Sequence, residues 1–182
     1  VLSDGTIKGN IQLQSDNVNC NEWMESEEVT TSETSTTSEA YEVIRVPGNI
    51  DMTIVANAKK VLYDDLTLKN MKGTLIVKDQ AVRLKNVEST LFDGQLGING
   101  TYATKNNGKP LVDLDYVMTD IDVQEAFLHF NSFQQIAPIA KYVEGTFSSS
   151  LKLDGQLGKD MMPEMMSFSG DGMAAMLKAT LV

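Results

Sequence analysis

Apolar and polar residues alternate along most of this 182-residue chain, and a period of two predicts β-strands. Val112, Leu114, Tyr116 and Met118 show the pattern clearly, since every second residue is apolar. Strands of this kind are expected at residues 5–14, 41–46, 50–60, 62–68, 73–78, 82–85, 96–102, 112–118, 146–153 and 172–182. Short connections between them, such as Asp79-Gln80, indicate antiparallel hairpins.

The period changes after residue 120, where the sequence predicts helices. Asp122 and Glu125 have the spacing of a capping box, in which side-chain oxygens accept hydrogen bonds from free amides at a helix start. Ser132 and Gln135 repeat this spacing. We therefore expect two short helices around 122–143, and a further short helical turn at 161–166. The fold class is mainly β (α+β).

Glycines recur within the strand patterns. Four segments share an apolar-x-Gly-Thr/Asn-apolar signature, and Asp-Gly-Gln-Leu-Gly occurs identically at 93–97 and 154–158. Glycine in a strand permits a bend, a bulge or a close backbone approach. The expected structural glycines are Gly9, Gly73, Gly94, Gly97, Gly100, Gly145, Gly155 and Gly158. They predict a strongly curled antiparallel meander, shaped as a groove or half-barrel, although they are equally compatible with simple turns.

The chain is expected to form a single domain over 1–182, with one mobile loop. Residues 24–40 are almost entirely Glu, Ser and Thr, and bury too little apolar surface to offset the entropy of ordering. Eight acidic residues and no basic ones lie between Lys8 and Arg45, so this region carries most of the net charge of −10. The rest of the chain is close to neutral. Nucleic-acid binding is therefore disfavoured, because it needs a basic face.

Residues suited to catalysis are scarce. His129 is the single histidine, and its helical position indicates a packing residue rather than a base. Cys20 is the single cysteine, which excludes an intrachain disulfide and a CxxC site. The carboxylate pairs Asp64-Asp65 and Asp113 with Asp115 are more typical of solvated faces than of a metal or glycosidase centre. We predict a protein that is not an enzyme and holds no cofactor or metal.

Three segments together resemble the C-terminal region of AsmA-family proteins of the Bacteroidetes type, over roughly residues 46–173. They are LKNMKGTLIVKDQAVRLKNVESTLFDGQLGINGTY, IAPIAKYVEGTFSSSLKLDG and MPEMMSFSGDG. Each motif is short, and their order along the chain carries the likeness. The resemblance implies a periplasmic module whose parent protein is anchored in the inner membrane by a segment outside this chain, which begins at Val1. It also implies a long β-groove of the kind that carries phospholipid acyl chains in related lipid-transfer proteins, and a role in outer-membrane assembly and lipid homeostasis.

The first hypothesis is therefore a lipid-binding or lipid-transfer module of the cell envelope. The apolar residues expected to line its groove are Leu75, Val77, Val82, Leu84, Leu96, Ile98, Val112, Leu114 and Tyr116. All of them fit a closed core equally well. The alternative is a scaffold for envelope protein assembly that pairs through exposed sheet edges, such as Gly172–Val182. A glycan-binding domain has little support, because its usual aromatic platforms are scarce, with only Trp23 and five Tyr.

Overall fold

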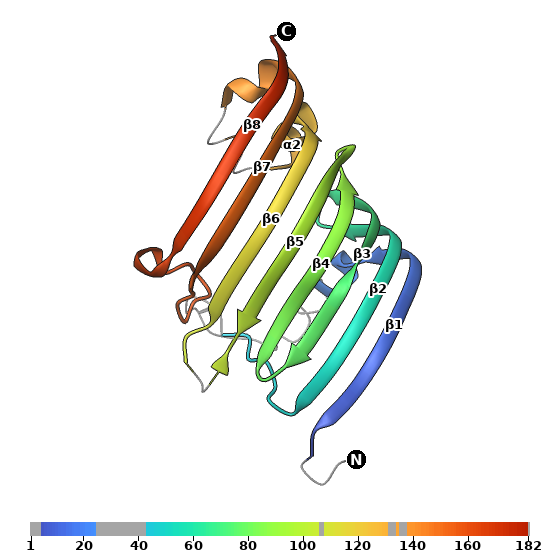
Figure 1. The fold of residues 1–182 in the computed structure, drawn as a ribbon, viewed down its shortest axis with the longest axis vertical. Coiled ribbons are helices and arrows are strands. Elements are labelled where there is room, and N and C mark those ends of the chain that lie inside the picture. Colours follow the sequence, from blue (N-terminus) through green and yellow to red (C-terminus); the bar gives the residue numbers. More distant parts are fainter. Residues whose placement is uncertain (1–4, 25–42, 106–107, 131–133, 135–137, 182) are drawn as a thin grey trace, which may run out of the picture.

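One eight-stranded sheet contains most of the residues that the computed structural model describes, which are 5–24, 43–105, 108–130, 134 and 138–181 (Figure 1). The strands are β1 (Ile7–Asn19), β2 (Ile50–Tyr63), β3 (Leu66–Lys78), β4 (Ala81–Leu91), β5 (Gly94–Ala103), β6 (Leu111–Asp122), β7 (Val143–Gln156) and β8 (Ser169–Leu181). The helical elements are α1 (Asn21–Met24), α2 (Val123–His129), and two 3₁₀ turns, η3 (Pro138–Tyr142) and η4 (Met165–Ser167). The mainly β class is thus confirmed.

The strands lie in chain order, from β1 at one edge to β8 at the other, and the sheet does not close on itself (Figure 1). From β2 to β8 every neighbouring pair is antiparallel, as the meander prediction requires. β1, however, is parallel to β2, with Ile7 opposite Ile50 and Asn19 opposite Leu62. The purely antiparallel prediction was wrong here. A connection of thirty residues, 20–49, brings the chain back to the same end of the sheet, and parallel pairing needs such a crossover.

Two-residue loops join β2 to β3, β3 to β4, and β4 to β5. Asp79 and Gln80 both have positive φ, at 53° and 56°, as do Phe92 and Asp93, at 47° and 59°. Positive φ at both central positions is the type I′ turn, whose twist matches that of the flanking strands. The predicted hairpin across Asp79-Gln80 is therefore confirmed, and it places Val77 opposite Val82.

Three residues inside the strands also have left-handed backbone conformations. Asn70, Asn86 and Asp120 have φ of 52°, 49° and 55°, and each lies where the pairing register shifts. Asn and Asp tolerate this conformation better than most residues other than glycine. The extra residue at each bulge moves the alternation by one, so that Leu84 and Val87 face the same side although they are three positions apart.

The two faces of the sheet differ sharply in polarity. Cross-strand pairs on one face are apolar, as in Leu75 with Leu84 or Ile98 with Tyr116. We call this the apolar face, and the opposite one the polar face. Ion pairs join neighbouring strands on the polar face, among them Lys59–Asp16 at 2.7 Å, Lys72–Glu88 at 3.0 Å, Lys78–Asp51 at 2.8 Å and Lys152–Asp115 at 3.5 Å.

Helix α2 covers the apolar face near the end of β6 (Figure 1). Its start matches the prediction, because the Asp122 carboxylate accepts a hydrogen bond from the backbone N–H of Glu125 at 2.9 Å. Ala126 of α2 packs in a buried cluster with Leu91, Leu96 and Ile121. This end of the sheet therefore holds a closed core.

Several other predicted elements differ from the structure or fall outside it. Of the second predicted helix the structure describes Gln134, which is helical, and the residues of η3; the predicted capping residues Ser132 and Gln135 lie outside the described residues. The loop predicted at 24–40 falls outside them too, apart from Met24. Residues 43–46 of the predicted 41–46 strand are not in a strand, and the backbone N–H of Val46 donates to the side-chain hydroxyl of Thr104 instead of to another strand. The helical turn expected at 161–166 is confirmed in part, as η4.

The glycine signatures do not all mark strand starts. Gly9 and Gly145 lie near the starts of β1 and β7, whereas Gly73 and Gly100 lie in the middle of their strands. The two copies of the pentapeptide also lie at different places in their strands. Gly94 begins β5, whereas the equivalent Gly155 lies near the end of β7. Identical local sequences therefore occupy different positions in the sheet.

Gly94 is required by a close approach of backbone. A Cβ at this position would lie 2.5 Å from the carbonyl oxygen of Thr119 and 2.7 Å from that of Asp120. At Gly97, in the same strand, the nearest atom would be 3.9 Å away, the carbonyl oxygen of Val117. Only the first glycine holds β5 against β6 at a distance that excludes a methyl group.

We predict that Gly94→Ala lowers the free energy of unfolding by about 2–3 kcal/mol, because backbone atoms must move to admit the Cβ. Gly97→Ala is the matched control and should stay within about 0.5 kcal/mol of the wild type. Urea denaturation followed by far-UV circular dichroism measures both. Equal effects of the two substitutions would contradict the close approach at Gly94.

Candidate ligand-binding face

All nine residues predicted to line a groove lie on the apolar face. The pairing register sets Val77 opposite Val82 and Leu75 opposite Leu84. Across the next strands, Leu96 and Ile98 pair with Met118 and Tyr116, while Leu114 and Val112 lie opposite Gly100 and Tyr102. Cross-strand partners point to the same side of a sheet. The structure therefore brings the nine side chains together on one surface.

This surface is closed at one place and open at others. Leu96 is only 8% exposed, because it belongs to the cluster under α2. Leu84, by contrast, is 38% exposed, and Leu75 and Leu114 are half-buried. Leu96 is thus a core residue, whereas the centre of the face remains accessible among the described residues.

The apolar face continues onto strands that the predicted set omitted. Ile11 and Leu13 of β1 pair with Ile54 and Ala56 of β2, and Ile54 in turn pairs with Leu75. Ile11 and Leu13 are 43% and 44% exposed. Their alternation was visible in the sequence, but only the parallel pairing of β1 shows that they extend the same surface.

The end of the face opposite α2 is partly covered by two segments from elsewhere in the chain. The hydroxyl of Tyr102 donates a hydrogen bond to the carbonyl oxygen of Ile44 at 2.8 Å and lies 3.7 Å from the sulfur of Met161. The ring of Phe168 lies so close to Gly155 that a Cβ there would be 2.6 Å from it. The open part of the face is therefore bounded by α2 at one end and only partly covered at the other.

Tyr102 is the ionisable side chain that this environment perturbs. Partial burial raises the pKa of Tyr102 above its ordinary value, and the nearby Arg45 guanidinium opposes this shift. The phenol therefore stays neutral in the folded protein at pH values where an unfolded chain would begin to lose its proton.

The polar face holds the carboxylates considered as a catalytic pair. Asp115 forms its ion pair with Lys152, while Asp113 lies opposite Asp154 on β7. All of these groups lie on an exposed sheet surface with charges of both signs. This arrangement fits a solvated face.

His129 lies in a polar hollow of about 590 Å³ beside α2. Its Nδ1 lies 2.7 Å from the Asp65 carboxylate, and its ring stacks on Phe92 with centroids 5.2 Å apart. The other ring nitrogen faces the carboxylate of Glu125 at 3.7 Å, not a hydroxyl or thiol. The histidine thus ties the end of α2 to the β2–β3 turn, and its contacts differ from those of a base that activates a nucleophile.

Other site classes find little support in the part of the chain that the structure covers. It contains no group of three or more His, Cys, Asp or Glu side chains that could hold a metal ion. Among the same residues, no helix has the length and apolar character needed to cross a membrane. Comparison of the chain with protein-family models, curated proteins and solved structures gives no match. The AsmA resemblance therefore stays a prediction, and the apolar face is the candidate site.

We predict that Tyr102 makes folding stability depend on alkaline pH. Its raised folded-state pKa adds stability that is complete below the unfolded pKa, about 10, and is lost as the pH rises through the folded value. Tyr102→Phe should remove this alkaline loss, and should cost about 1 kcal/mol at pH 7 through the missing hydrogen bond to Ile44. Unfolding free energies between pH 7 and pH 11 test this. Parallel pH curves for the two proteins would contradict burial of the phenol.

Proposed function

We propose that this chain is a non-enzymatic module that binds the acyl chains of phospholipid on its apolar face. The observation that carries the proposal is an open, single-layered sheet whose apolar face stays accessible at Leu84, Ile11 and Leu13. Contiguous exposed apolar surface of this kind marks binding sites in soluble proteins. An acyl chain offers a partner without polar groups, so no hydrogen-bond donor is needed along the face.

The dimensions of the face suit such a ligand. Eight strands spaced about 4.8 Å apart span roughly 34 Å, and an acyl chain in one bilayer leaflet is about 15 Å long. Each methylene group buried against the face contributes about 0.8 kcal/mol. We further propose that the sheet curls around the ligand, and that α2 limits the groove at one end.

The cellular setting follows from the resemblance to AsmA-family proteins. In this proposal the chain works in the periplasm, its parent protein is anchored in the inner membrane, and lipid passing along the groove supports outer-membrane assembly and lipid homeostasis. The polar face, with its cross-strand ion pairs, would then face water or neighbouring envelope proteins.

We predict that gently purified protein carries phospholipid, detected by organic extraction and mass spectrometry, and that Leu84→Asp reduces the lipid at least tenfold. A carboxylate in the middle of the apolar face would lose its water shell against an acyl chain, which is unfavourable. Val117→Asp is the matched control. Val117 is 50% exposed but lies opposite Gly97 on the polar face, so its substitution should leave lipid content unchanged.

Thermal unfolding of both variants separates binding from folding. Absence of lipid from the wild type would contradict the proposal, as would equal loss in the two variants. Loss in Leu84→Asp alone, at unchanged stability, supports a ligand on the apolar face.

The exposed edges favour a second candidate function, a scaffold that pairs with other strands. Among the described residues, no strand pairs with the outer edge of β8, and its residues 169–176 are exposed, including Met173 at 70% and Met176 at 45%. It contains no proline, and its charged residues are Asp171 and Lys178. An edge strand with so few charges is suited to strand addition.

We predict for this candidate that the chain self-associates at high concentration, measured by sedimentation velocity, and that removing Gly172–Val182 abolishes the larger species. A truncated chain that still binds lipid but stays monomeric would favour the scaffold as a separate function of the edge. A wild type that is monomeric at all concentrations would contradict self-pairing through β8.

A further inference from the structure

The connection between β7 and β8, residues 157–168, exposes an unusual amount of apolar side chain. Met162, Met165 and Met166 are 63%, 79% and 102% exposed. They lie within a segment that contains four methionines in six residues. Methionine is flexible and polarisable, and such side chains adapt to irregular apolar partners. We call these three residues the methionine tip.

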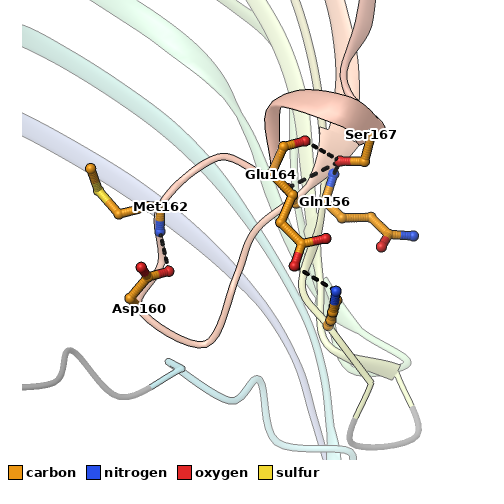
Figure 2. A network of polar contacts seen from close by, with 6 residues as sticks. Gln156, Asp160, Met162, Glu164 and Ser167 are labelled. Atoms are coloured by element: carbon orange, nitrogen blue, oxygen red, sulfur yellow. Dashed lines mark hydrogen bonds and ion pairs between the residues drawn. The ribbon is translucent and has the colours of Figure 1, made fainter.

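The backbone beneath the methionine tip is held by a local hydrogen-bond network (Figure 2). The hydroxyl of Ser167 donates to the carbonyl oxygen of Glu164 at 2.7 Å and accepts from the backbone N–H of Gln156 at 2.9 Å. The Asp160 carboxylate accepts from the N–H of Met162 at 3.2 Å, and the side chain of Met162 extends away from these polar contacts (Figure 2). The exposed methionines therefore stand on an ordered loop.

Backbone pairing fastens the same loop to the end of the sheet. The N–H of Leu157 donates to the carbonyl oxygen of Pro110, and that of Glu164 donates to Gln156, at 2.9 and 3.0 Å. Met161 has a positive φ of 60°, which is costly for a residue with a long side chain. The loop holds this conformation because both of its ends are fixed.

The loop is also continuous with the apolar face. Met161, next to the methionine tip, touches the hydroxyl of Tyr102, and Phe168 at the other end of the loop lies on Gly155. Tyr102 and Gly155 both pair with Val112, one of the predicted groove residues. An acyl chain leaving the face at this end would therefore pass directly beside the exposed methionines.

Charge within this loop is balanced. Lys159 and Asp160 offset each other within the loop, and Glu164 is ion-paired with Lys109 at 2.5 Å. A neutral apolar protrusion gains nothing from anionic headgroups but can insert between zwitterionic ones. We infer that the methionine tip contacts the surface of a phospholipid bilayer, where acyl chains enter or leave the apolar face. This inference rests on the proposed lipid-binding function.

Flotation of the full chain with phosphatidylcholine vesicles tests the inference. The wild type should float with the vesicles, and the double variant Met165→Ser, Met166→Ser should bind them at least tenfold more weakly, because two apolar side chains no longer insert. Met173→Ser is the matched control. Met173 is 70% exposed but lies opposite Ser150 on the polar face, so its substitution should leave flotation unchanged.

Binding of cis-parinaric acid without vesicles separates this inference from the proposed function. The double variant should bind this fluorescent fatty acid as the wild type does, since both substituted residues lie outside the apolar face. If the wild type does not float, or if the double variant floats equally well, the bilayer contact is overturned even where fatty-acid binding persists. If the chain floats through the tip but binds no fatty acid, the bilayer contact stands and the proposed function fails.

A protein partner would give a different result. Self-association in sedimentation velocity that disappears in the double variant, without flotation of the wild type, would show that the tip meets a second copy of the chain. That outcome also overturns the bilayer contact.

Discussion

The alternation of side chains across extended backbone is the constraint on which the rest of this structure depends. Successive residues of a strand point to opposite faces, and a slip of one residue would move a whole apolar set to the wrong side. Here the strands are up to fourteen residues long, and Asn70, Asn86 and Asp120 reset the alternation inside them. Because of these resets, Leu84 and Val87 stay on one face together with residues from the neighbouring strands.

A single sheet with one apolar face exposes that face to water unless another layer covers it, and in this chain the cover is only partial. Two sheets, or a sheet and a layer of helices, normally bury such a face. Here α2 buries one end of it, around Leu91 and Ile121, and the segment ending at Phe168 covers part of the other. The centre of the face remains in contact with water. Binding of an apolar ligand there would be favourable, because it removes this apolar surface from water.

The polar and charged side chains described above connect elements of the fold to one another. His129 joins a helix end to the β2–β3 turn through the Asp65 carboxylate, and Lys72 pairs with Glu88 across two strands. Exposed pairs of this kind contribute little stability individually, but opposite charges on facing positions favour the correct register. The cross-strand ion pairs lie on the face opposite Leu75 and Leu84, so an acyl chain on the apolar side would not meet them.

The sequence by itself determined most of the strands, the start of α2 and the nine residues of the apolar face, because period-two alternation and the capping spacing of Asp122 and Glu125 are local properties. It also carried an unused signal for the bulges, in apolar residues three apart around an Asn or Asp, such as Leu84 and Val87. Only the tertiary structure decided that β1 runs parallel to β2, that Leu96 is closed core while Leu84 is open, and that identical pentapeptides have different settings. These three features depend on contacts between residues distant in the sequence. No local pattern specifies which strands pair with each other or which part of the sheet α2 packs against.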